Sequence, residues 1–223
     1  MSDERLVNPE LTACEVHGMS RASFLLRGAM ATGAVYGVAA VGPYVSSALA
    51  QSSSGGTGSN SAARMNASDA EILNFALTLE YLESDFYNVK AKQVGLSGQA
   101  KSYAKLFGEE ESQHVEALTA AIKQLGGKPV AKPTFVFPAN NEQTFLALAS
   151  VLENTGVGAY NGAAPSLHSK QVLAEAGEIV QIEARHAAAI ELLLGHTPTP
   201  NGGFDVPLTK AQVLAKAGPL IKA

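Results

Sequence analysis

Cysteine is almost missing from this sequence, since Cys14 is the only one among 223 residues. A single thiol near the N-terminus leaves any domain after it without a disulfide and without a thiolate metal site. Tryptophan is absent and aromatic residues make up only 6% of the chain, whereas alanine is abundant, which favours helices over a β-sandwich or barrel. The composition therefore predicts an all-α domain.

Charge is also scarce. Charged residues make up 16% of the chain, and the formal net charge is −4. No run of lysine and arginine is dense enough to follow a phosphate backbone, so nucleic acid is not an expected partner. The length suits a single hydrophobic core with some tail to spare.

An apolar stretch at residues 28–45 follows a polar segment that ends in "SRASFLLRG" and precedes "SSALAQ". This is the order of a signal peptide with an A-x-A cleavage site, so we expect residues 1–50 to be an export signal that is removed after Ala50. The mature protein would then lie in the periplasm, the cell envelope or outside the cell, with no stable membrane insertion. A core helix or membrane anchor is the alternative, but the stretch is rich in glycine, contains Pro43 and falls short of about 20 strongly apolar residues.

The export route stays open. The long polar region and "SRASFLL" resemble a twin-arginine signal, whose pattern has two adjacent arginines. Here Arg21 is followed by Ala22, so one arginine is missing, and both the twin-arginine and the general secretory route stay open.

A linker is expected after the signal. Residues 51–64 are mostly serine and glycine and have almost nothing to bury, which is typical of a flexible linker. The folded domain is therefore predicted to span residues 65–223.

Apolar periodicity and end signals predict four long helices. The first should start at a capping box, Ser68 to Glu71, and stop at Gly95. The expected ranges are about 69–91, about 99–125, a third from residue 142 to the break at Pro165, and about 170–194. Thr209 and Gln212 should cap a short terminal helix.

The connections between these helices define the topology. A short loop joins the first two helices, so they should pack antiparallel. Residues 128–141, "KPVAKPTFVFPANN", are too long for a tight turn and too rich in proline for a helix. We therefore expect an antiparallel four-helix bundle with a long crossover between helices 2 and 3, and with a third helix weakened at Gly156 and Gly158.

The sequence contains an internal repeat. "LEYLESDFYN" aligns with "LENTGVGAYN", which pairs Glu80 with Glu153 and Tyr87 with Tyr160. About 30 residues after each glutamate comes a Glu-x-x-His motif, "ESQH" in the first half and "EARH" in the second. The sequence therefore predicts that the bundle consists of two copies of one helical hairpin.

The repeated residues have the character of metal ligands. Residues three apart share a helix face, so each Glu-x-x-His motif projects an oxygen and a nitrogen in one direction. Glu80 and Glu153 lie in apolar stripes, and buried carboxylates need a compensating positive charge. We therefore expect two iron or manganese ions, with a hydrogen-bonded polar core as the alternative. The predicted ligands are Glu80, Glu111, His114, Glu153, Glu183 and His186.

Several residues beside this set have open roles. Glu83 is either an additional ligand or a group that contacts the ligands; its counterpart in the repeat is Gly156. Tyr87 and Tyr160 either hydrogen-bond the ligands or pass electrons, or are ordinary buried tyrosines with satisfied hydroxyls. No catalytic residue separate from the ligands is expected. The polar residues expected at the surface are Glu109, Glu110, Glu116, His168 and His196.

Residues 65–220 resemble the ferritin-like superfamily, and specifically its exported, desiccation-related branch. The likeness lies in "ILNFALTLEYLESDFY", "EEESQHVEAL", "IEARHAAAIELLLG" and "FDVPLTKAQVLAK". One glutamate from each of two helices and a Glu-x-x-His motif from each of the other two is also the ligand pattern of ferritin-like di-iron and di-manganese proteins. The resemblance thus implies the bundle and the metal centre, but no particular reaction.

Two functional hypotheses follow. The first is a redox di-metal protein that reacts with oxygen, peroxide or ferrous iron in stress protection; if it is an enzyme, it is a di-metal oxidoreductase of ferroxidase-like or catalase-like type. The second is a non-catalytic structural or stress protein of the envelope, whose bundle needs no redox chemistry. Mineral storage would require a hollow homo-oligomer.

Overall fold

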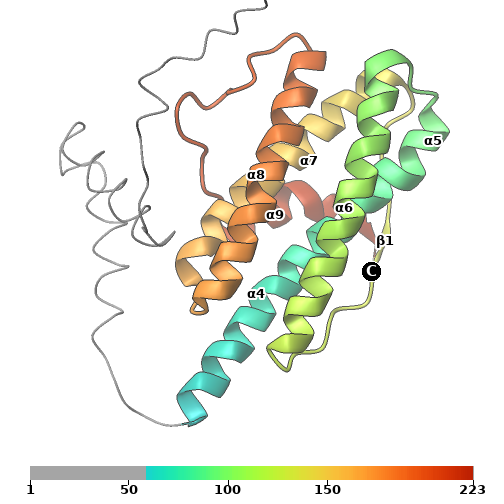
Figure 1. Cartoon of the computed structure of the whole chain (residues 1–223). Helices are drawn as coiled ribbons and strands as arrows, with labels where there is room; N and C mark the ends of the chain where they lie inside the picture. Colours follow the sequence, from blue (N-terminus) through green and yellow to red (C-terminus); the bar gives the residue numbers. More distant parts are fainter. Residues whose placement is uncertain (1–58, 223) are drawn as a thin grey trace, which may run out of the picture. The chain divides into compact units, whose positions relative to one another are not determined.

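A computed structural model of the chain describes residues 59–222, with side chains from residue 64 onward. The described part is all-α, as predicted, and two helical hairpins pack as a four-helix bundle (Figure 1). The long helices are α4 (Ser59–Asp85), α6 (Gly98–Gln124), α7 (Glu142–Ala163) and α8 (Lys170–Leu193). None of the helices within residues 59–222 is long and apolar enough to cross a membrane. The predicted export signal, with Cys14, lies outside the described residues.

Helix α4 begins earlier than predicted. It starts at Ser59, so the last residues of the predicted linker are helical, and the predicted capping box around Ser68 lies inside the helix. The carboxylate of Asp69 has a different partner: it accepts hydrogen bonds from the backbone N–H groups of His168, at 3.0 Å, and Ser169, at 2.8 Å. A residue within the predicted capping box therefore joins α4 to the start of α8.

The C-terminal end of the first long helix is also less regular than predicted. A π-helical turn, Phe86–Lys90, follows α4 and leads into the short helix α5 (Ala91–Val94). Gly95 then adopts a φ of 72°, a left-handed conformation that glycine tolerates and that ends the helix, as expected from the sequence.

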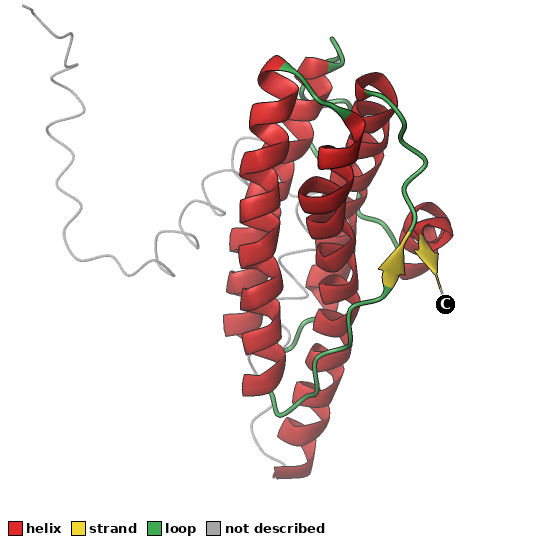
Figure 2. Cartoon of the chain, turned by 90° about the vertical axis from the view of Figure 1, so that its right-hand side faces the viewer, coloured by secondary structure: helices red, strands yellow, loops and turns green. Residues whose placement is uncertain are grey.

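The crossover between α6 and α7 carries a short strand that the sequence did not predict. Strand β1 (Thr134–Phe135) pairs antiparallel with β2 (Ile221–Lys222) near the C-terminus, as Figure 2 shows. The N–H of Val136 also donates to the carbonyl of Leu220 at 2.9 Å. Two residues per strand are too few to show the alternation by which strands are recognised.

The second hairpin follows its predicted boundaries. Asn141 and Thr144 form a capping box at the start of α7, and a 3₁₀ turn with Pro165 ends it. The weakening expected at two glycines is not found, because α7 is continuous from Glu142 to Ala163. Helix α8 ends before Gly195, and Thr209 with Gln212 caps α9 (Lys210–Ala217), as predicted.

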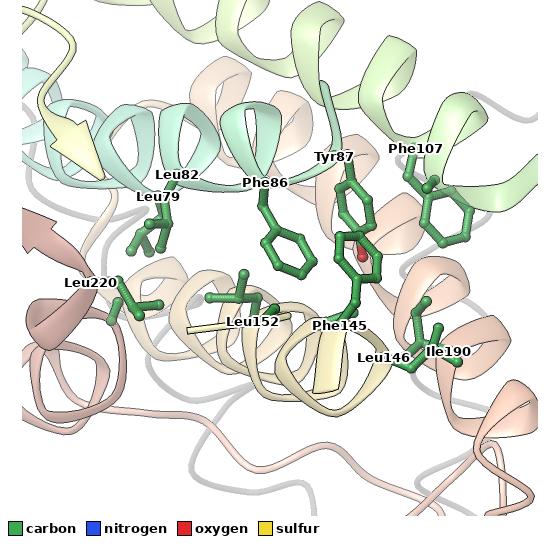
Figure 3. Packing of buried hydrophobic residues seen from close by; sticks show 14 of the residues in the cluster. Leu79, Leu82, Phe86, Tyr87, Phe107, Phe145, Leu146, Leu152, Ile190 and Leu220 are labelled. Atoms are coloured by element: carbon green, nitrogen blue, oxygen red, sulfur yellow. The ribbon is translucent and has the colours of Figure 1, made fainter. Parts of the chain in front are cut away.

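The apolar core consists of two clusters that leave a gap between them on α6 and on α8. In the larger cluster Phe86 of the π-helical turn stacks on Phe145 of α7 at 4.2 Å between ring centroids (Figure 3). The smaller cluster contains Leu73, Leu77 and Ile122. On α6 the first cluster ends at Phe107 and the second begins at Leu118, so the residues between them are available for a polar site.

Candidate metal centre

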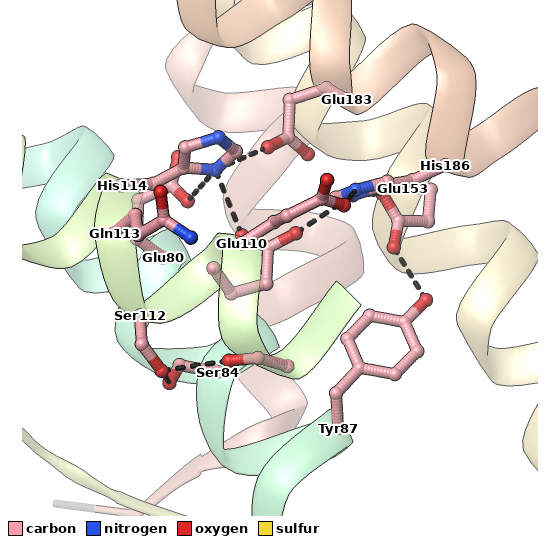
Figure 4. A network of polar contacts seen from close by, with 12 residues as sticks. Glu80, Ser84, Tyr87, Glu110, Ser112, Gln113, His114, Glu153, Glu183 and His186 are labelled. Carbon is pink, nitrogen blue, oxygen red and sulfur yellow. Dashed lines mark hydrogen bonds and ion pairs between the residues drawn. The ribbon is translucent and has the colours of Figure 1, made fainter. Parts of the chain in front are cut away.

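The structure places all six predicted ligands in the middle of the bundle. Each of the four long helices contributes, and the two Glu-x-x-His motifs of α6 and α8 face one another (Figure 4). The four glutamates have no exposed surface, and the two histidines are 7% and 2% exposed. The residues are Glu80 on α4, Glu111 and His114 on α6, Glu153 on α7, and Glu183 and His186 on α8.

These side chains form two overlapping groups. In each group four ligand atoms lie within 4.8 Å of one another, a separation that one metal ion could bridge. The first group is Glu80, Glu111, His114 and Glu183; the second is Glu111, Glu153, Glu183 and His186. The two groups share the glutamates of the Glu-x-x-His motifs, so each shared carboxylate could contact two ions.

The histidines approach the carboxylates in the same way in both halves. Nδ1 of His114 lies 3.2 Å from Glu80, 3.2 Å from Glu111 and 3.0 Å from Glu183. Nδ1 of His186 lies 2.9 Å from Glu111 and 3.5 Å from Glu153. The Nδ1 atoms therefore face the interior of the site from two sides, as the internal repeat requires.

Several buried atoms of the site have no hydrogen-bond partner within the described part of the chain. They are Oε2 of Glu83, Oε1 of Glu111, Oε2 of Glu153, both carboxylate oxygens of Glu183, and Nδ1 of His186. Leaving a buried polar atom unpaired costs roughly 1–3 kcal/mol, and native proteins rarely do so. Oε1 of Glu111 and Nδ1 of His186 are only 2.9 Å apart but lack the geometry of a hydrogen bond, as expected of atoms directed at a common ion.

The charges in the site also call for a cation. Burial, then repulsion from neighbouring carboxylates, raises the pKa of Glu83 and Glu183 well above the ordinary value. Burial likewise raises the pKa of Glu111, to about 7, although its histidine partners oppose the shift. These carboxylates are hard to ionise together because their negative charges repel one another, and the positive charge of a divalent ion would relieve that repulsion. Carboxylate and imidazole ligands suit iron and manganese.

The histidines shift in the opposite sense. Burial lowers the pKa of His114, but its close contacts with the carboxylates of Glu111, Glu183 and Glu80 outweigh burial and raise it to about 12. His186 follows the same balance, with burial opposed by its carboxylate partners, and its pKa rises to about 11. Without a metal, protonated imidazoles supply part of the positive charge that the site requires.

The two tyrosines hydrogen-bond predicted ligands across the bundle. Tyr87, in the π-helical turn, donates its hydroxyl to Glu153 of α7 at 2.5 Å, and Tyr160 of α7 donates to Glu80 of α4. Each hairpin thus positions a carboxylate of the other. Burial and the adjacent carboxylates raise the pKa of both hydroxyls well above the ordinary value, so both remain donors.

Glu83 lies beside the predicted ligands and is 2% exposed. A Cβ atom placed on Gly156 would lie 3.3 Å from Oε1 of Glu83 and 3.0 Å from Oε2 of Glu183. The glycine that replaces Glu83 in the second half of the repeat therefore provides space for the Glu83 side chain. Glu83 stands outside both four-residue groups and contacts the site from one side.

Glu110 is a correction to the sequence analysis, which placed it on a solvated face. Its side chain is 32% exposed, and Oε2 lies 2.7 Å from Nε2 of His186. The contact crosses from α6 to α8, so helical spacing could not reveal it, and the repeat offers no signal because Ile182 is the counterpart. The other predicted surface residues are exposed as expected: Glu109, Glu116, His168 and His196.

The comparison with protein-family models gives one result. A model described as a ferritin-like domain matches residues 68–196, from within α4 to just beyond α8. The matched segment contains all six predicted ligands. No curated protein matches the chain.

Proposed function

The chain belongs to the ferritin-like family, and on this premise we propose that its bundle binds two iron or manganese ions. The observation that carries the proposal is the set of buried, unpaired carboxylate and imidazole atoms that converge from both hairpins. A polar core without metal would have to pair these atoms with one another. Their short separations without hydrogen-bond geometry favour ions between them.

The predicted ligands would form two ion-binding positions. Glu80 and His114 would hold one ion, Glu153 and His186 the other, and the shared glutamates of α6 and α8 would contact both. The carboxylate of Glu110 accepts from Nε2 of His186, so the ring presents Nδ1 to the site, an arrangement that orients histidine ligands in many metalloproteins.

Iron or manganese would supply a redox couple that can react with oxygen or peroxide. The chain's own residues would hold the carboxylates in place and exclude bulk water. Tyr87 and Tyr160 restrain Glu153 and Glu80, and the two apolar clusters close the site toward both ends of the bundle. Two reactions are consistent with such a site: disproportionation of peroxide to water and oxygen, and oxidation of ferrous iron as a substrate with oxygen or peroxide as electron acceptor.

We further propose that the protein is exported and acts in stress protection. This rests on the signal-like N-terminal segment and on the resemblance to the desiccation-related branch. Finding the protein with residues 1–50 removed, by mass spectrometry of the cell envelope or medium, is the expected result. An intact N-terminus in the cytoplasm would refute it.

The proposal is tested by metal content. Elemental analysis of the protein purified from its native source should give about two iron or manganese ions per chain. Glu111→Gln and Glu183→Gln should each remove at least one ion, because each of these carboxylates belongs to both four-residue groups. Glu116→Gln, an exposed change on α6, is the matched control and should retain the full content.

The same samples separate the redox protein from a structural one. Metal-loaded protein should consume peroxide or ferrous iron, and the two glutamine variants should lose that activity together with metal. Stoichiometric metal without turnover would favour a structural metal centre in a non-catalytic envelope protein. No stoichiometric metal after anaerobic reconstitution with ferrous iron or manganese would exclude the metal centre.

A further inference from the structure

The two tyrosines that hydrogen-bond predicted ligands lie in different kinds of helix. Tyr160 belongs to α7, which is a regular α-helix. Tyr87 lies in the π-helical turn Phe86–Lys90, where the N–H of Ala91 donates to the carbonyl of Phe86, five residues back. Such turns are rare and frequently lie at functional sites. The internal repeat is therefore broken in the backbone that carries one tyrosine, and the irregular turn requires contacts that hold it in place.

Asn88 connects this turn to α6. Its side-chain amide donates to the carbonyl oxygen of Gly108 at 2.7 Å. The same amide nitrogen lies 3.2 Å from the hydroxyl of Ser112 and 3.3 Å from that of Ser84, and all three contacts are part-buried. Acceptors from α4 and α6 thus surround one amide in the middle of the turn.

Gly108 provides the space for this amide. A Cβ atom on Gly108 would lie 2.7 Å from Oδ1 of Asn88 and 3.0 Å from its Cγ, which is closer than a Cβ atom normally comes to another atom. Gly108 also precedes Glu111 by three residues, so both lie on one face of α6. The segment of α6 that carries a predicted ligand therefore also anchors the π-helical turn.

The anchored turn reaches the metal centre through Tyr87, whose hydroxyl donates to Glu153 at 2.5 Å. Glu153 belongs only to the second group of predicted ligands, and we call the ion position that it would form the second position. A path of contacts thus runs from α6 through Asn88 and Tyr87 to a carboxylate of α7. The ring of Tyr87 also packs against Phe107 at 5.5 Å between centroids, so apolar packing is the competing explanation for where its hydroxyl lies.

We propose that Asn88 is a positioning residue for the second position. By fixing the π-helical turn to α6, Asn88 sets where the hydroxyl of Tyr87 meets Glu153 and thereby orients that carboxylate. Tyr160 needs no such anchor, because it lies in a regular helix. Loss of the Asn88 amide should therefore disturb one ion position and leave the other unchanged. The effect on metal binding rests on the proposed metal centre, whereas the placement of Tyr87 does not.

The first experiment uses the full-length, metal-free protein with tyrosine labelled with ¹³C at Cζ, the ring carbon that bears the hydroxyl. The chemical shift of this carbon reports the hydrogen bonding of the hydroxyl, and Tyr87→Phe assigns the resonance. Asn88→Ala should move the Tyr87 resonance towards its position in the urea-unfolded protein. Gly108→Ala displaces the same amide from the side of α6 and should cause the same shift. The Tyr160 resonance should stay in place in both variants.

The internal repeat supplies a matched control. Asn161 is aligned with Asn88 in the sequence but lies in the regular helix α7. Asn161→Ala should therefore leave the Tyr87 resonance unchanged. Asn88→Ser is a milder change at the same position and takes the place of Asn88→Ala if the alanine variant does not fold.

The second experiment measures manganese affinity on the same variants by competition with a chelator. Contacts that support metal ligands typically change affinity by 10–100-fold when altered. Asn88→Ala should therefore weaken the binding of one of the two ions about tenfold and leave the other as in the wild type. Asn161→Ala should bind both ions as the wild type does.

Two results would overturn the proposal. The first is a Tyr87 resonance that stays in place in folded Asn88→Ala and Gly108→Ala proteins with lowered unfolding temperatures, because Asn88 would then only stabilise the fold. The second is equal weakening of both ions by Asn88→Ala. A protein that binds no stoichiometric metal but shows the Tyr87 shift would refute the metal centre and still support the placement of Tyr87 by Asn88, so the two failures are distinguishable.

Discussion

Gly156 shows how one missing side chain shapes the candidate site. Its absent Cβ leaves the space in which the carboxylates of Glu83 and Glu183 approach α7. A helix interior normally disfavours glycine by about 1 kcal/mol relative to alanine, so glycine at this position lowers the stability of α7 but leaves space beside the predicted ligands.

We expect Gly156→Ala to displace Glu83 and to shift Glu183. Because groups that support metal ligands typically change affinity by 10–100-fold when altered, metal affinity should fall about tenfold while the helical content stays unchanged. Competition with a chelator measures the affinity, and circular dichroism measures the helices.

Gly177→Ala is the control for this substitution. Gly177 lies within α8, and nothing stands within 4 Å of an added Cβ. The change should leave metal affinity unaltered and raise the free energy of unfolding by about 0.5–1 kcal/mol. Equal metal affinity in the Gly156 variant and the wild type would contradict the role given to Gly156.

The sequence alone predicts a contact between two side chains only where the geometry of a single helix determines that contact. Residues three apart lie on one face, so the pairing of Glu111 with His114 follows from spacing. The contact of Glu110 with His186 does not, because it depends on the distance and rotation between α6 and α8. For the same reason the tyrosines could be aligned by the repeat, whereas their crossed hydrogen bonds to the opposite hairpin could not be predicted.

At the scale of the elements, Asp69 joins α4 to α8. Its carboxylate accepts from two backbone N–H groups at the start of α8 and contacts the ring of His168 at 3.0 Å. Asp69→Ala should lower the free energy of unfolding by about 2–3 kcal/mol, since it leaves two part-buried backbone donors without their acceptor. Urea denaturation measures the loss.

Two further variants make this test specific. Asp69→Asn keeps one acceptor oxygen and should cost less than the alanine change. Ser68→Ala would lose about 1 kcal/mol if Ser68 capped the helix, but within α4 it should change stability by less than about 0.5 kcal/mol. A larger loss from Ser68→Ala than from Asp69→Ala would contradict the observed start of α4.

A second contact between elements holds the segment before α9. The N–H of Leu208 donates to the carbonyl of Gly158 at 2.8 Å, and a Cβ on Gly162 would lie 1.9 Å from the carbonyl oxygen of Leu208. Backbone cannot yield as a flexible side chain can, so Gly162→Ala should force this segment off α7.

The expected cost of Gly162→Ala is about 2 kcal/mol or more, with faster proteolysis in residues 196–208. Urea denaturation and limited proteolysis are the measurements, and Gly177→Ala again serves as the control. Wild-type stability in the Gly162 variant would show that the segment does not dock closely. Close contacts also explain the glycines in the middle of α7, which had predicted a weakened helix. Gly156 and Gly158 leave space for neighbouring side chains, and the helix itself is continuous.

At the scale of the whole molecule, buried charge makes the stability of the metal-free protein depend on pH. The pKa values of Glu83 and Glu183 are raised well above 4.5, and that of Glu111 is raised to about 7. The folded state therefore keeps protons that the unfolded chain releases near pH 4.5. The stability from these protons is fully present below that pH and is lost as the pH rises through the folded pKa values.

The other shifted groups do not reverse this trend. His114 and His186, with pKa values raised to about 12 and 11, contribute stability that is full below pH 6.5 and declines above it. Carboxyl groups with lowered pKa values complete their contribution by about pH 4.5; they are Asp69, Glu80 and Glu191. We therefore expect the metal-free protein to unfold about 5 °C higher at pH 5 than at pH 8, measured by calorimetry. A higher unfolding temperature at pH 8 would contradict the charge balance described for the site.

Because the ligand groups each draw on both hairpins, the order of assembly is constrained. Within each hairpin, α4 with α6 and α7 with α8, a short connection joins the two helices, so each hairpin can form early. The pairing of the crossover with the C-terminal strand, in contrast, brings together residues far apart in the chain. Neither hairpin alone offers four ligands to an ion. Loading would thus follow the docking of the hairpins, and an ion supplied during synthesis would find its coordination shell only after almost the whole domain had left the ribosome.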